Sequence, residues 1–557
     1  MAEASQKDGW LAALRVYGER RTLAMFALGF AAGLPFLLIF DTLSAWLRQE
    51  GVSLQTIAFF NLATLAYGFK FLWAPVVDRT QVPWLTSRLG HRRSWMLICQ
   101  AGIMIGFVLI AAGKPATNLA LVASLAVLTG FIGATQDIVI DAWRIEVAPE
   151  NRQGVMVAAY QWGYRIGFIV AGAAPLLLAD TFGWPLSYGA MASLMLIGVA
   201  GVFLAPREQE HHVRPLPRPD GPPRPVATTV EWIVRLAILA VGAIILGSGL
   251  SGKGDLLASM LSQDASAAFK AMWAGNVTAQ MTAVLIGFAV IVFAAWPLPG
   301  KPTQPGLYLS HAFGDPIADF VRRFGSLALL ILGLVCSYRL SDFMLNLMNP
   351  FYLDLGYTLT QIASVRKIYG AFMFLLGATL GGVAIARWGL MRAVVIGAIV
   401  APVSNVMFAW LTTQGPDIPA LFIALGFNNS AQAFAGTCLI AYMSSLTSIG
   451  FTATQYALFS SLYSLPDKVI ITQTGRMVEA AARSANEGGL FAPLMTWFEA
   501  LPAGSFAGGA ENLGVSPHAL AAGYVVFFFV TALIPAVIAT PLAVMVARRQ
   551  KPKTPAP

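Results

Sequence analysis

TNLALVASLAVLTGFIGATQDIVIDA, residues 117–142, is apolar over most of its length and is long enough to cross a bilayer. A helix needs about 20 predominantly apolar residues to span a hydrocarbon core of about 30 Å. The part Leu119–Leu128 is apolar on every face, whereas a spanning strand would alternate apolar and polar residues. Because lipid offers no hydrogen-bond partners, such a run can satisfy its backbone only as a helix. It therefore predicts a transmembrane helix.

Runs of this kind recur along the chain and place the whole protein in a membrane. Of its 557 residues, 57% are hydrophobic and 11% are charged, whereas about a quarter of the residues of a soluble domain are charged. The sequence predicts an all-α polytopic membrane protein with about fourteen spans. Their approximate bounds are 22–47, 56–77, 94–113, 117–142, 154–178, 186–205, 230–250, 276–296, 325–349, 358–386, 391–412, 417–446, 452–477 and 519–547.

The basic residues are distributed unevenly between the loops, and this distribution predicts the orientation. If the N-terminus is cytoplasmic, the inside loops collect most of the 36 Lys and Arg residues. The outside loops then hold only Arg48, Lys114, Lys253, Lys270 and Arg483. The positive-inside rule therefore predicts that both termini are cytoplasmic. The net charge of +9 follows from this topology, so we expect no nucleic-acid partner.

Two proline-rich stretches separate groups of predicted helices. Residues 206–226 are rich in proline and charge and predict a linker after the first six helices. Two further spans precede WPLPGKPTQPG, and GDPIADFVRRFG after it is typical of a short interfacial helix. We expect an N-terminal six-helix bundle at 1–205, a linker region with two extra transmembrane helices at 206–324, and a C-terminal six-helix bundle with a cytoplasmic tail at 325–557.

The two halves share a short repeat. GVSLQTIA at Gly51–Ala58 matches GYTLTQIA at Gly356–Ala363, and each leads into the second helix of its half. At the same offset, Asp41 falls opposite Asn346. Two six-helix halves related by a repeat, with a cavity between them at the membrane midplane, are the architecture of many secondary transporters. The repeat therefore favours a transporter.

The loop between the second and third predicted helices reads VVDRTQVPWLTSRLGHRRSW. With inserted residues, it resembles the D-R-x-G-R-R pattern of the major-facilitator family. A carboxylate and arginines at helix ends can form a charge-assisted latch that breaks when two halves rock. We therefore expect a cytoplasmic gate formed by Asp78, Arg79, Arg92 and Arg93. The alternative is that the basic residues only anchor the helix ends at the interface.

The run that opens this section also carries acids that are costly inside a membrane. Asp137 and Asp141 are four residues apart and share one face of the predicted helix. A charge at mid-bilayer costs about 2.5–3.5 kcal/mol on insertion scales. Burial and a like-charged neighbour both favour a protonated carboxyl, which a reversible proton carrier requires. We expect Asp137 to couple transport to protons, unless a basic residue pairs with it permanently. Asp141 is the second candidate, with Arg144, Arg152 or Arg165 as its alternative partner.

Basic, amide and aromatic side chains on the predicted helices are candidates for binding a substrate. Charges that face one cavity would favour an anionic ligand, and amides and aromatic faces suit sugar hydroxyls and peptide groups. The candidates are Lys70, Gln136, Tyr160, Gln161, Tyr164, Arg165, Asn428, Asn429, Gln432 and Lys468. The basic members could instead snorkel or pair with acids, as Arg339 could with Asp342.

Three segments of the first half resemble the AmpG family of muropeptide permeases. They are LPFLLIFDTLSAWLRQEGVSLQTIAFF at 34–60, LAYGFKFLWAPVVDR at 65–79 with LGHRRSW at 89–95, and ATQDIVIDAWRIEV at 134–147. The resemblance implies a major-facilitator fold in a bacterial inner membrane, with two extra helices between the bundles as in some members. It implies proton-coupled import of N-acetylglucosaminyl-anhydro-N-acetylmuramyl peptides, and it supports Asp137 as a functional acid.

Other functions remain open at this point. Related carriers of acetyl-coenzyme A or of drugs would have the same hydropathy. A membrane-embedded enzyme that modifies glycan or lipid could use paired carboxylates, but the sequence contains no H-E-x-x-H and no G-x-S-x-G motif. The three cysteines have neither paired nor metal-ligand spacing. We expect no metal and no cofactor, and a carrier that acts as a monomer on a glycopeptide substrate and protons.

Overall fold

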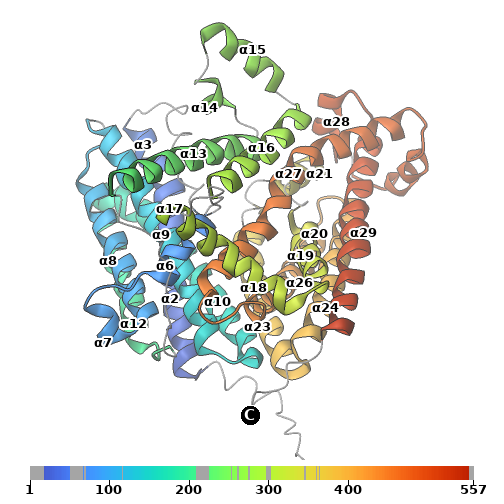
Figure 1. Cartoon of the computed structure of the whole chain (residues 1–557). Helices are drawn as coiled ribbons and strands as arrows, with labels where there is room; N and C mark the ends of the chain where they lie inside the picture. Colours follow the sequence, from blue (N-terminus) through green and yellow to red (C-terminus); the bar gives the residue numbers. More distant parts are fainter. Residues whose placement is uncertain are drawn as a thin grey trace, which may run out of the picture. The chain divides into compact units, whose positions relative to one another are not determined.

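In the computed structural model, helices joined by turns and short loops make up both halves of the chain (Figure 1). Among the described residues there is no strand. The chain divides into two compact units, one of residues 1–212, 329–463 and 474–557 and one of residues 213–328 and 464–473. The described residues are 18–50, 67, 70–115, 117–208, 225–251, 254–259, 262–273, 276–295, 303–343, 347–358, 361–362, 364–502 and 504–550.

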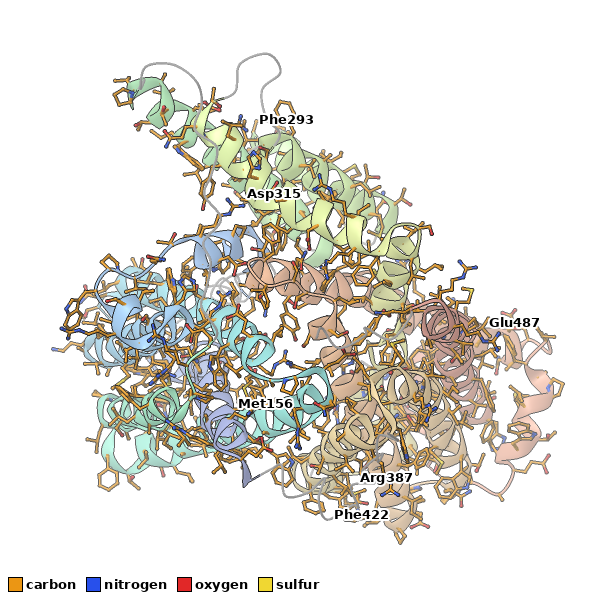
Figure 2. All side chains as sticks on the ribbon, turned by 60° about the horizontal axis from the view of Figure 1, so that its bottom comes forward. Met156, Phe293, Asp315, Arg387, Phe422 and Glu487 are labelled. Carbon is orange, nitrogen blue, oxygen red and sulfur yellow. The ribbon has the colours of Figure 1, made fainter. Side chains whose placement is uncertain are left out.

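The first half of the larger unit is a helical bundle around an apolar core. Its core includes Phe107, Tyr188 and Met156, all fully buried; Met156 is labelled in Figure 2. Its elements are α2 (Arg20–Leu37), η2 (Leu38–Thr42), α3 (Leu43–Gln49), η4 (Lys70–Leu72), α6 (Ala74–Arg79), α7 (Leu85–Leu89), α8 (His91–Ala112), α9 (Leu119–Val147), α10 (Glu150–Phe182), α11 (Trp184–Leu194) and α12 (Leu196–Leu204).

The second half of the larger unit is a bundle of its own. Its core is aromatic, with Phe351, Phe408 and Phe528 fully buried against one another. Its elements are α19 (Leu327–Ser337), α20 (Leu340–Phe343), α21 (Met348–Leu355), η7 (Ser364–Tyr369), α23 (Gly370–Trp388), α24 (Leu390–Ser404), α25 (Val406–Gln414), α26 (Ile418–Ser445), α27 (Thr452–Asn486), η8 (Ala492–Phe498), α28 (Ala507–Leu513) and α29 (Pro517–Arg549).

Glycines allow the closest helix contacts in both halves. A Cβ at Gly29 or Gly33 of α2 would lie 2.4 or 2.3 Å from a carbonyl oxygen of α10. A Cβ at Gly377 or Gly381 of α23 would lie 2.1 or 3.0 Å from a carbonyl oxygen of α26. The four-residue spacing of small residues in each pair predicts a close helix contact, and the structure confirms it. Helix α2 contacts both α10 and α9.

The predicted spans are helical wherever the structure describes them, but several are interrupted. Eight helices of the described residues are long and apolar enough to cross a membrane alone, and up to ten if each bent pair is one span. The stretch 22–47 is broken by the π-helical turn η2, which follows Pro35 at the end of α2. The stretch 391–412 is broken at Asn405. The octapeptide Gly51–Ala58, part of Gly356–Ala363, and Asn346 lie outside the described residues.

The smaller unit holds the two extra helices. They are α13 (Pro225–Ser251) and α16 (Val277–Ala295), which pack against each other as a hairpin. Between them lie α14 (Asp255–Ala258) and α15 (Gln263–Trp273), and after them α17 (Gln304–Leu309), η5 (Ser310–Gly314) and α18 (Asp315–Phe324). Helix α18 forms where the sequence predicts a short interfacial helix; its Ile317 and Val321 are exposed and its Phe320 is buried.

Candidate functional site

Asp137 lies in the interior of the first half, beside α10. Its carboxylate accepts a hydrogen bond from the Tyr160 hydroxyl, and the Lys70 ammonium is close enough to interact with its charge. Oδ1 is buried and has no hydrogen-bond partner among the described residues. A buried carboxylate is costly unless it is paired, bonded or protonated. One oxygen of Asp137 is therefore available for a proton or a ligand.

Aromatic side chains surround Asp137. Tyr67 and Tyr164 also interact electrostatically with it. The ring centroids of Tyr160 and Tyr164 are 5.8 Å apart. A Cβ at Gly133, one turn before Asp137, would lie 2.5 Å from Tyr67 Oη, so the glycine lets this phenol approach α9. Tyr67 Oη is buried without a partner among the described residues, which gives the cluster a second unsatisfied polar atom.

Two glutamines predicted to bind substrate have different surroundings. Gln136 is fully buried, and neither its amide oxygen nor its amide nitrogen has a partner in the described part of the chain. Gln161 on α10 is half-buried. Buried amides without partners are rare, because each costs the hydration that it has lost. Gln136 therefore keeps unused hydrogen-bonding capacity one residue before Asp137 in α9.

Arg165 forms a second positive centre, next to the other half. Its guanidinium lies 4.3 Å from the ring centroid of Phe374 on α23. Among the described residues no carboxylate forms an ion pair with it. Arg339 lies close enough to interact with it electrostatically. Arg339 itself pairs with Asp342, which confirms that prediction. Arg165 thus has an aromatic partner, and its positive charge is available to an anionic ligand.

The amides predicted on α26 have bonds inside the second half. Asn428 donates to Ser404 Oγ and Asn405 Oδ1, each at 2.9 Å. Gln432 donates to Ala401 O and Asn405 Oδ1 at 3.4 Å. Because both are almost fully buried at the α24–α25 break, this geometry gives them a structural role in joining helices. Asn429 donates to Gly370 O at 3.3 Å. The Lys468 side chain lies outside the described residues.

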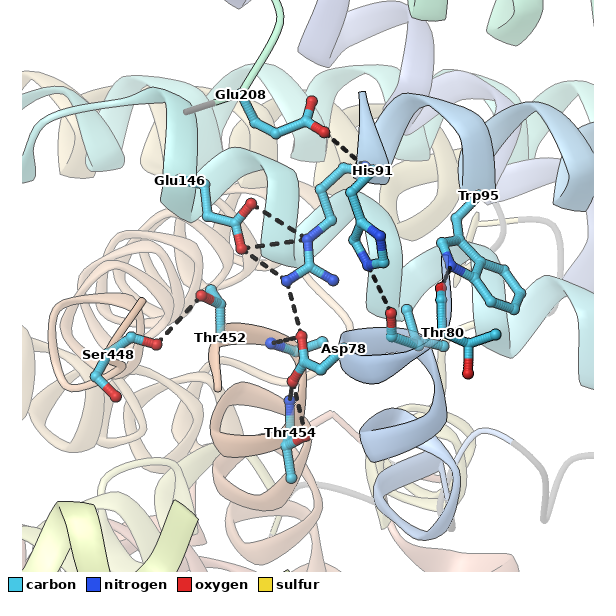
Figure 3. Close-up of polar contacts among 12 residues, drawn as sticks. Asp78, Thr80, His91, Trp95, Glu146, Glu208, Ser448, Thr452 and Thr454 are labelled. Atoms are coloured by element: carbon cyan, nitrogen blue, oxygen red, sulfur yellow. Dashed lines mark hydrogen bonds and ion pairs between the residues drawn. The ribbon is translucent and has the colours of Figure 1, made fainter. Parts of the chain in front are cut away.

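The predicted gate residues Asp78 and Arg92 meet in a buried network with Glu146. Arg92 Nη2 lies 2.7 Å from both Asp78 Oδ1 and Glu146 Oε1, and Arg92 Nε lies 3.2 Å from both Glu146 oxygens. Arg92 is fully buried. Figure 3 shows Glu146 and Asp78 at opposite ends of this network. The bidentate contact joins the end of α6, the start of α8 and the end of α9.

Asp78 continues from this network into the second half. Its Oδ2 accepts hydrogen bonds from the Thr454 amide at 2.8 Å and the Thr454 hydroxyl at 2.7 Å (Figure 3). Its Oδ1 accepts from the Ala453 amide at 3.3 Å. These amides belong to the first turn of α27, where backbone N–H groups lack helical partners and the helix dipole favours an anion. Asp78 is therefore an ionic cap that joins one half to the other.

The other two predicted gate arginines are placed differently. Arg93 Nε donates to Val202 O at 3.1 Å, at the end of α12 in the same half. Arg79 is half-buried at the end of α6. The hydrogen bonds between Asp78 and α27 involve Ala453 and Thr454 and neither of these arginines. Arg92 thus contacts Asp78, whereas Arg93 fixes the end of α12.

Asp141 and Arg144 form a second connection between the halves. Arg144 Nη2 lies 3.2 Å from Asp141 Oδ1, so one of the expected partners of Asp141 is present. Arg144 Nη1 donates to Ser444 Oγ of α26 at 2.9 Å and to Gln153 Oε1 at 3.1 Å. Its guanidinium also lies 5.3 Å from the Tyr456 ring centroid. Asp141 therefore holds an arginine that contacts the opposite half.

Three contributors to these connections were not among the predicted site residues. Glu146 is visible in the sequence as the last acid of ATQDIVIDAWRIEV. Glu208, at the start of the linker, accepts from the Arg92 amide at 2.8 Å and caps α8. Thr454 follows the SIGF turn, where a helix N-terminus could be expected from the sequence. Nothing in the sequence links Thr454 to Asp78, because only the packing of the halves brings them together.

Comparison with known proteins gives relatives over most of the chain. The family model of the Major Facilitator Superfamily matches residues 51–466. The AmpG 4 transporter of Rickettsia felis is 28% identical over 467 residues, which cover 83% of this chain and 91% of that protein. The anhydromuropeptide permease of Escherichia coli K12 is 28% identical over 470 residues, which cover 84% of this chain and 76% of that protein.

A solved structure shares the fold. The structure of the proton:xylose symporter XylE bound to 6-bromo-6-deoxy-D-glucose superposes with a TM-score of 0.51 and covers 96% of this chain and 95% of that chain. Its sequence identity is 11%, so the likeness concerns the fold alone. The curated relatives are named as transporters and permeases, which favours transport over the enzyme alternative.

Proposed function

Because the chain belongs to the Major Facilitator Superfamily, we propose that this multi-pass membrane transporter imports peptidoglycan-derived anhydro-muropeptides by alternating access, driven by protons. The name of the Escherichia coli relative, anhydromuropeptide permease, supports this substrate class. The proposal places the protein in a bacterial inner membrane with both termini in the cytoplasm. It places substrate uptake within the recycling of cell-wall material.

The side chains around Asp137 suit a glycopeptide. Lys70 and Arg165 supply positive charge for the carboxylates of a peptide, and Arg165 has no carboxylate ion pair among the described residues. Tyr160 and Tyr164 supply aromatic faces and hydroxyls for a sugar. We propose that these four, with Gln136 and Gln161, bind the substrate. We assign Asn428 and Gln432 to holding helices together, because both amides donate to Asn405 and to a residue of α24.

Asp137, whose Oδ1 is buried, carries the proposal of proton coupling. Its one unpartnered oxygen can take a proton, and the Tyr160 hydroxyl and the Lys70 charge would hold the ionised form between transport steps. Protonation removes a buried negative charge and leaves Lys70 without its counter-charge. Lys70 could then bind an anionic substrate group, which links the proton to the substrate. The neutral site could also be buried by closure of the halves at lower cost.

The contacts of Asp78 with Ala453 and Thr454, which we call the latch, indicate which side of the transporter is closed. With a cytoplasmic N-terminus, the end of α6 and the start of α27 face the cytoplasm. The bonds of Asp78 to Ala453 and Thr454 would then keep the halves together on the cytoplasmic side. In this conformation the transporter would take up substrate from outside. We propose that substrate and proton binding release this latch.

The test is Asp137→Asn in proteoliposomes. The variant keeps the size of the side chain but cannot carry a proton. We expect it to lose accumulation of labelled anhydro-muropeptide under an imposed pH gradient by at least about tenfold, and to retain exchange of labelled for unlabelled substrate without a gradient. Exchange needs binding and alternating access but no net proton movement, so it separates coupling from folding.

Asp180→Asn is the matched control, because Asp180 lies on α10 and is exposed. It should accumulate substrate like the wild type. Normal accumulation by Asp137→Asn would remove Asp137 from the coupling mechanism. Uptake of acetyl-coenzyme A or a drug, with none of the muropeptide, would assign the protein to a sister group of carriers.

A further inference from the structure

The smaller unit contains an apolar pocket of about 770 Å³ that the transport proposal does not use. Its walls come from α13, α14, α15 and α16. They include Ile245, Leu257, Phe269, Trp273, Ala279 and Ile286. Its polar side chains, Asn276, Thr278 and Thr282, lie on or just before the first turns of α16. The pocket is therefore apolar along its length and polar toward one end.

Close contact of α13 and α16 creates the groove in which the pocket lies. A Cβ at Gly287 would lie 2.4 Å from the backbone nitrogen of Leu246, and one at Gly249 would lie 2.6 Å from Gln280 O. The two backbones thus nearly touch along one line. Larger side chains beside that line, such as Val241 and Ile245, line the pocket instead of filling the groove.

The amphipathic helix α15 closes one side of this groove. Phe269 and Trp273 stack with ring centroids 5.0 Å apart, and Trp273 is 5% exposed. A Cβ at Gly254 would lie 2.8 Å from Phe269, so the chain turns back tightly at this glycine. On the outer side, the exposed Lys270 pairs with Asp255 at 3.2 Å. The helix thus turns aromatic rings inward and charge outward, as a helix at a membrane interface does.

We propose that this pocket binds one acyl chain of a membrane phospholipid, with the headgroup near the first turn of α16. Residues Pro225–Gly249 of α13 are apolar and long enough to span, so the pocket lies beside a membrane helix. A pocket with three polar side chains holds water poorly, and left empty it would lose the dispersion contacts of its walls. Its volume falls in the range of small-molecule sites, about 300–1,000 Å³.

The bilayer itself is the source of the ligand. The exposed outer face of α16, with Leu285 and Phe293 each 70% exposed, would contact lipid directly (Figure 2 labels Phe293). An acyl chain is apolar, thin and flexible, and it reaches the groove from the same leaflet as α15. The polar end of the pocket and Lys270 suit the glycerol and phosphate of such a lipid. This inference needs only a membrane-embedded chain and does not depend on the transported substrate.

The experiment is photo-crosslinking of the full-length protein in nanodiscs that contain phosphatidylethanolamine with a diazirine-bearing acyl chain. Peptide mass spectrometry maps the labelled residues. We expect labels to be concentrated on α15 and on the pocket face of α16. Ala279→Trp should fill the pocket and reduce that labelling at least fivefold. Leu285→Trp, which puts the same tryptophan side chain on the exposed face of the same helix, should leave it unchanged.

The thermal unfolding midpoint of each variant shows whether the hairpin is intact. If Ala279→Trp unfolds early, the smaller Ala279→Leu replaces it. Equal labelling of the pocket and the Leu285 face would mean that the lipids only surround the helices, and it would overturn the proposal. Labelling that persists in a folded Ala279→Trp variant would overturn it as well.

Discussion

Asp137 and Asp141 lie one helical turn apart, and their partners give them different capacities. Asp141 is bonded by Arg144, whose other nitrogen contacts Ser444 of the opposite half. Asp137 has a tyrosine hydroxyl, a nearby lysine and one oxygen without a partner in the described part of the chain. An ion pair with further bonds holds its charge, whereas an incompletely bonded carboxyl can exchange a proton at lower cost. At this scale the helix position matters less than the neighbouring side chains.

Asp354 shows the same principle outside the membrane spans and leads to a pH prediction. Burial raises the pKa of Asp354, and the hydrogen bond that Tyr524 donates to Oδ2 at 2.7 Å opposes the rise. The folded state therefore binds this proton more tightly than the unfolded chain does. The contribution to stability is complete below the ordinary pKa of 3.8 and is lost as the pH rises through the raised pKa. The effect should stay below about 1 kcal/mol, because the carboxyl is only partly buried.

The measurement is the thermal unfolding midpoint of the wild type and Asp354→Asn from pH 4 upward. Since asparagine does not ionise, the unfolding midpoint of the variant should rise relative to that of the wild type as the pH rises. Tyr524→Phe removes the opposing bond, so it should extend the loss seen in the wild type to higher pH. Parallel midpoints for the wild type and Asp354→Asn at every pH would contradict this account of Asp354.

The sequence predicts candidates at this scale better than it predicts their roles. The spacing of Asp137 and Asp141 correctly places them on one helix, and their cost in lipid singles them out. For Asn428 and Gln432, the polarity that makes them candidates for binding also suits a helix break at Asn405. Only the positions of α24 and α25 distinguish the two uses. The local sequence around Asn428 and Gln432 cannot predict these positions, because their hydrogen-bond partners come from another helix.

At the scale of elements, the pair α2 and α10 depends on glycine. Gly163 lies where a Cβ would come within 2.0 Å of Phe26 O, a backbone atom that cannot move without shifting α2. We therefore expect Gly163→Ala to destabilise the bundle by about 1–3 kcal/mol or more, as overpacking does. The readouts are the thermal unfolding midpoint in detergent and the yield of folded protein.

Gly189→Ala is the matched control for this prediction. Gly189 is also a helical glycine of the first half, but a Cβ there meets nothing within 4 Å. It should be neutral or stabilise by up to about 1 kcal/mol, because alanine favours the helix. Equal midpoints for Gly163→Ala and the wild type would mean that α2 can move away from α10 without cost.

Element positions could be predicted from the sequence, whereas element shapes could not. Apolar length places helices such as α9 and α29 within a few residues of their bounds. The π-helical turn η2 and the break at Asn405 have no comparable signal, because Pro35 and Pro402 are compatible with a bent or a continuous helix. The spacing of Gly29 and Gly33 does predict a close contact, but the partner helix becomes known only from the fold.

At the scale of the whole transporter, the halves of the larger unit meet where α10 packs against α23 and α26, and also at α27. Ala453 and Ala457 of α27 join the apolar cluster of the first half that contains Trp143. Asp78 caps the same helix, and Arg144 reaches Ser444. The loop pattern in the sequence predicts that Asp78 and Arg92 form a latch. It does not predict that Asp78 also binds the N-terminus of α27, because that helix lies far away in sequence.

Asp78→Asn tests whether this cap sets the balance between the two access states. Asparagine keeps the side-chain size, but it can accept hydrogen bonds only through one oxygen and carries no charge for the dipole of α27 or for Arg92. Hydrogen bonds to a charged group are worth about 1.5–3 kcal/mol, so the open state on this side should gain at least about tenfold in population. Spin labels at Asn151→Cys and Ile449→Cys, one in each half near the same membrane face, would report a longer distance by double electron–electron resonance. Glu19→Gln is the matched control, because Glu19 pairs with Arg152 at 3.6 Å within one half at the same end. It should leave the distance distribution unchanged, whereas an unchanged distribution in Asp78→Asn would show that the other contacts between the halves, those of α27 and of α10, keep them closed without the cap.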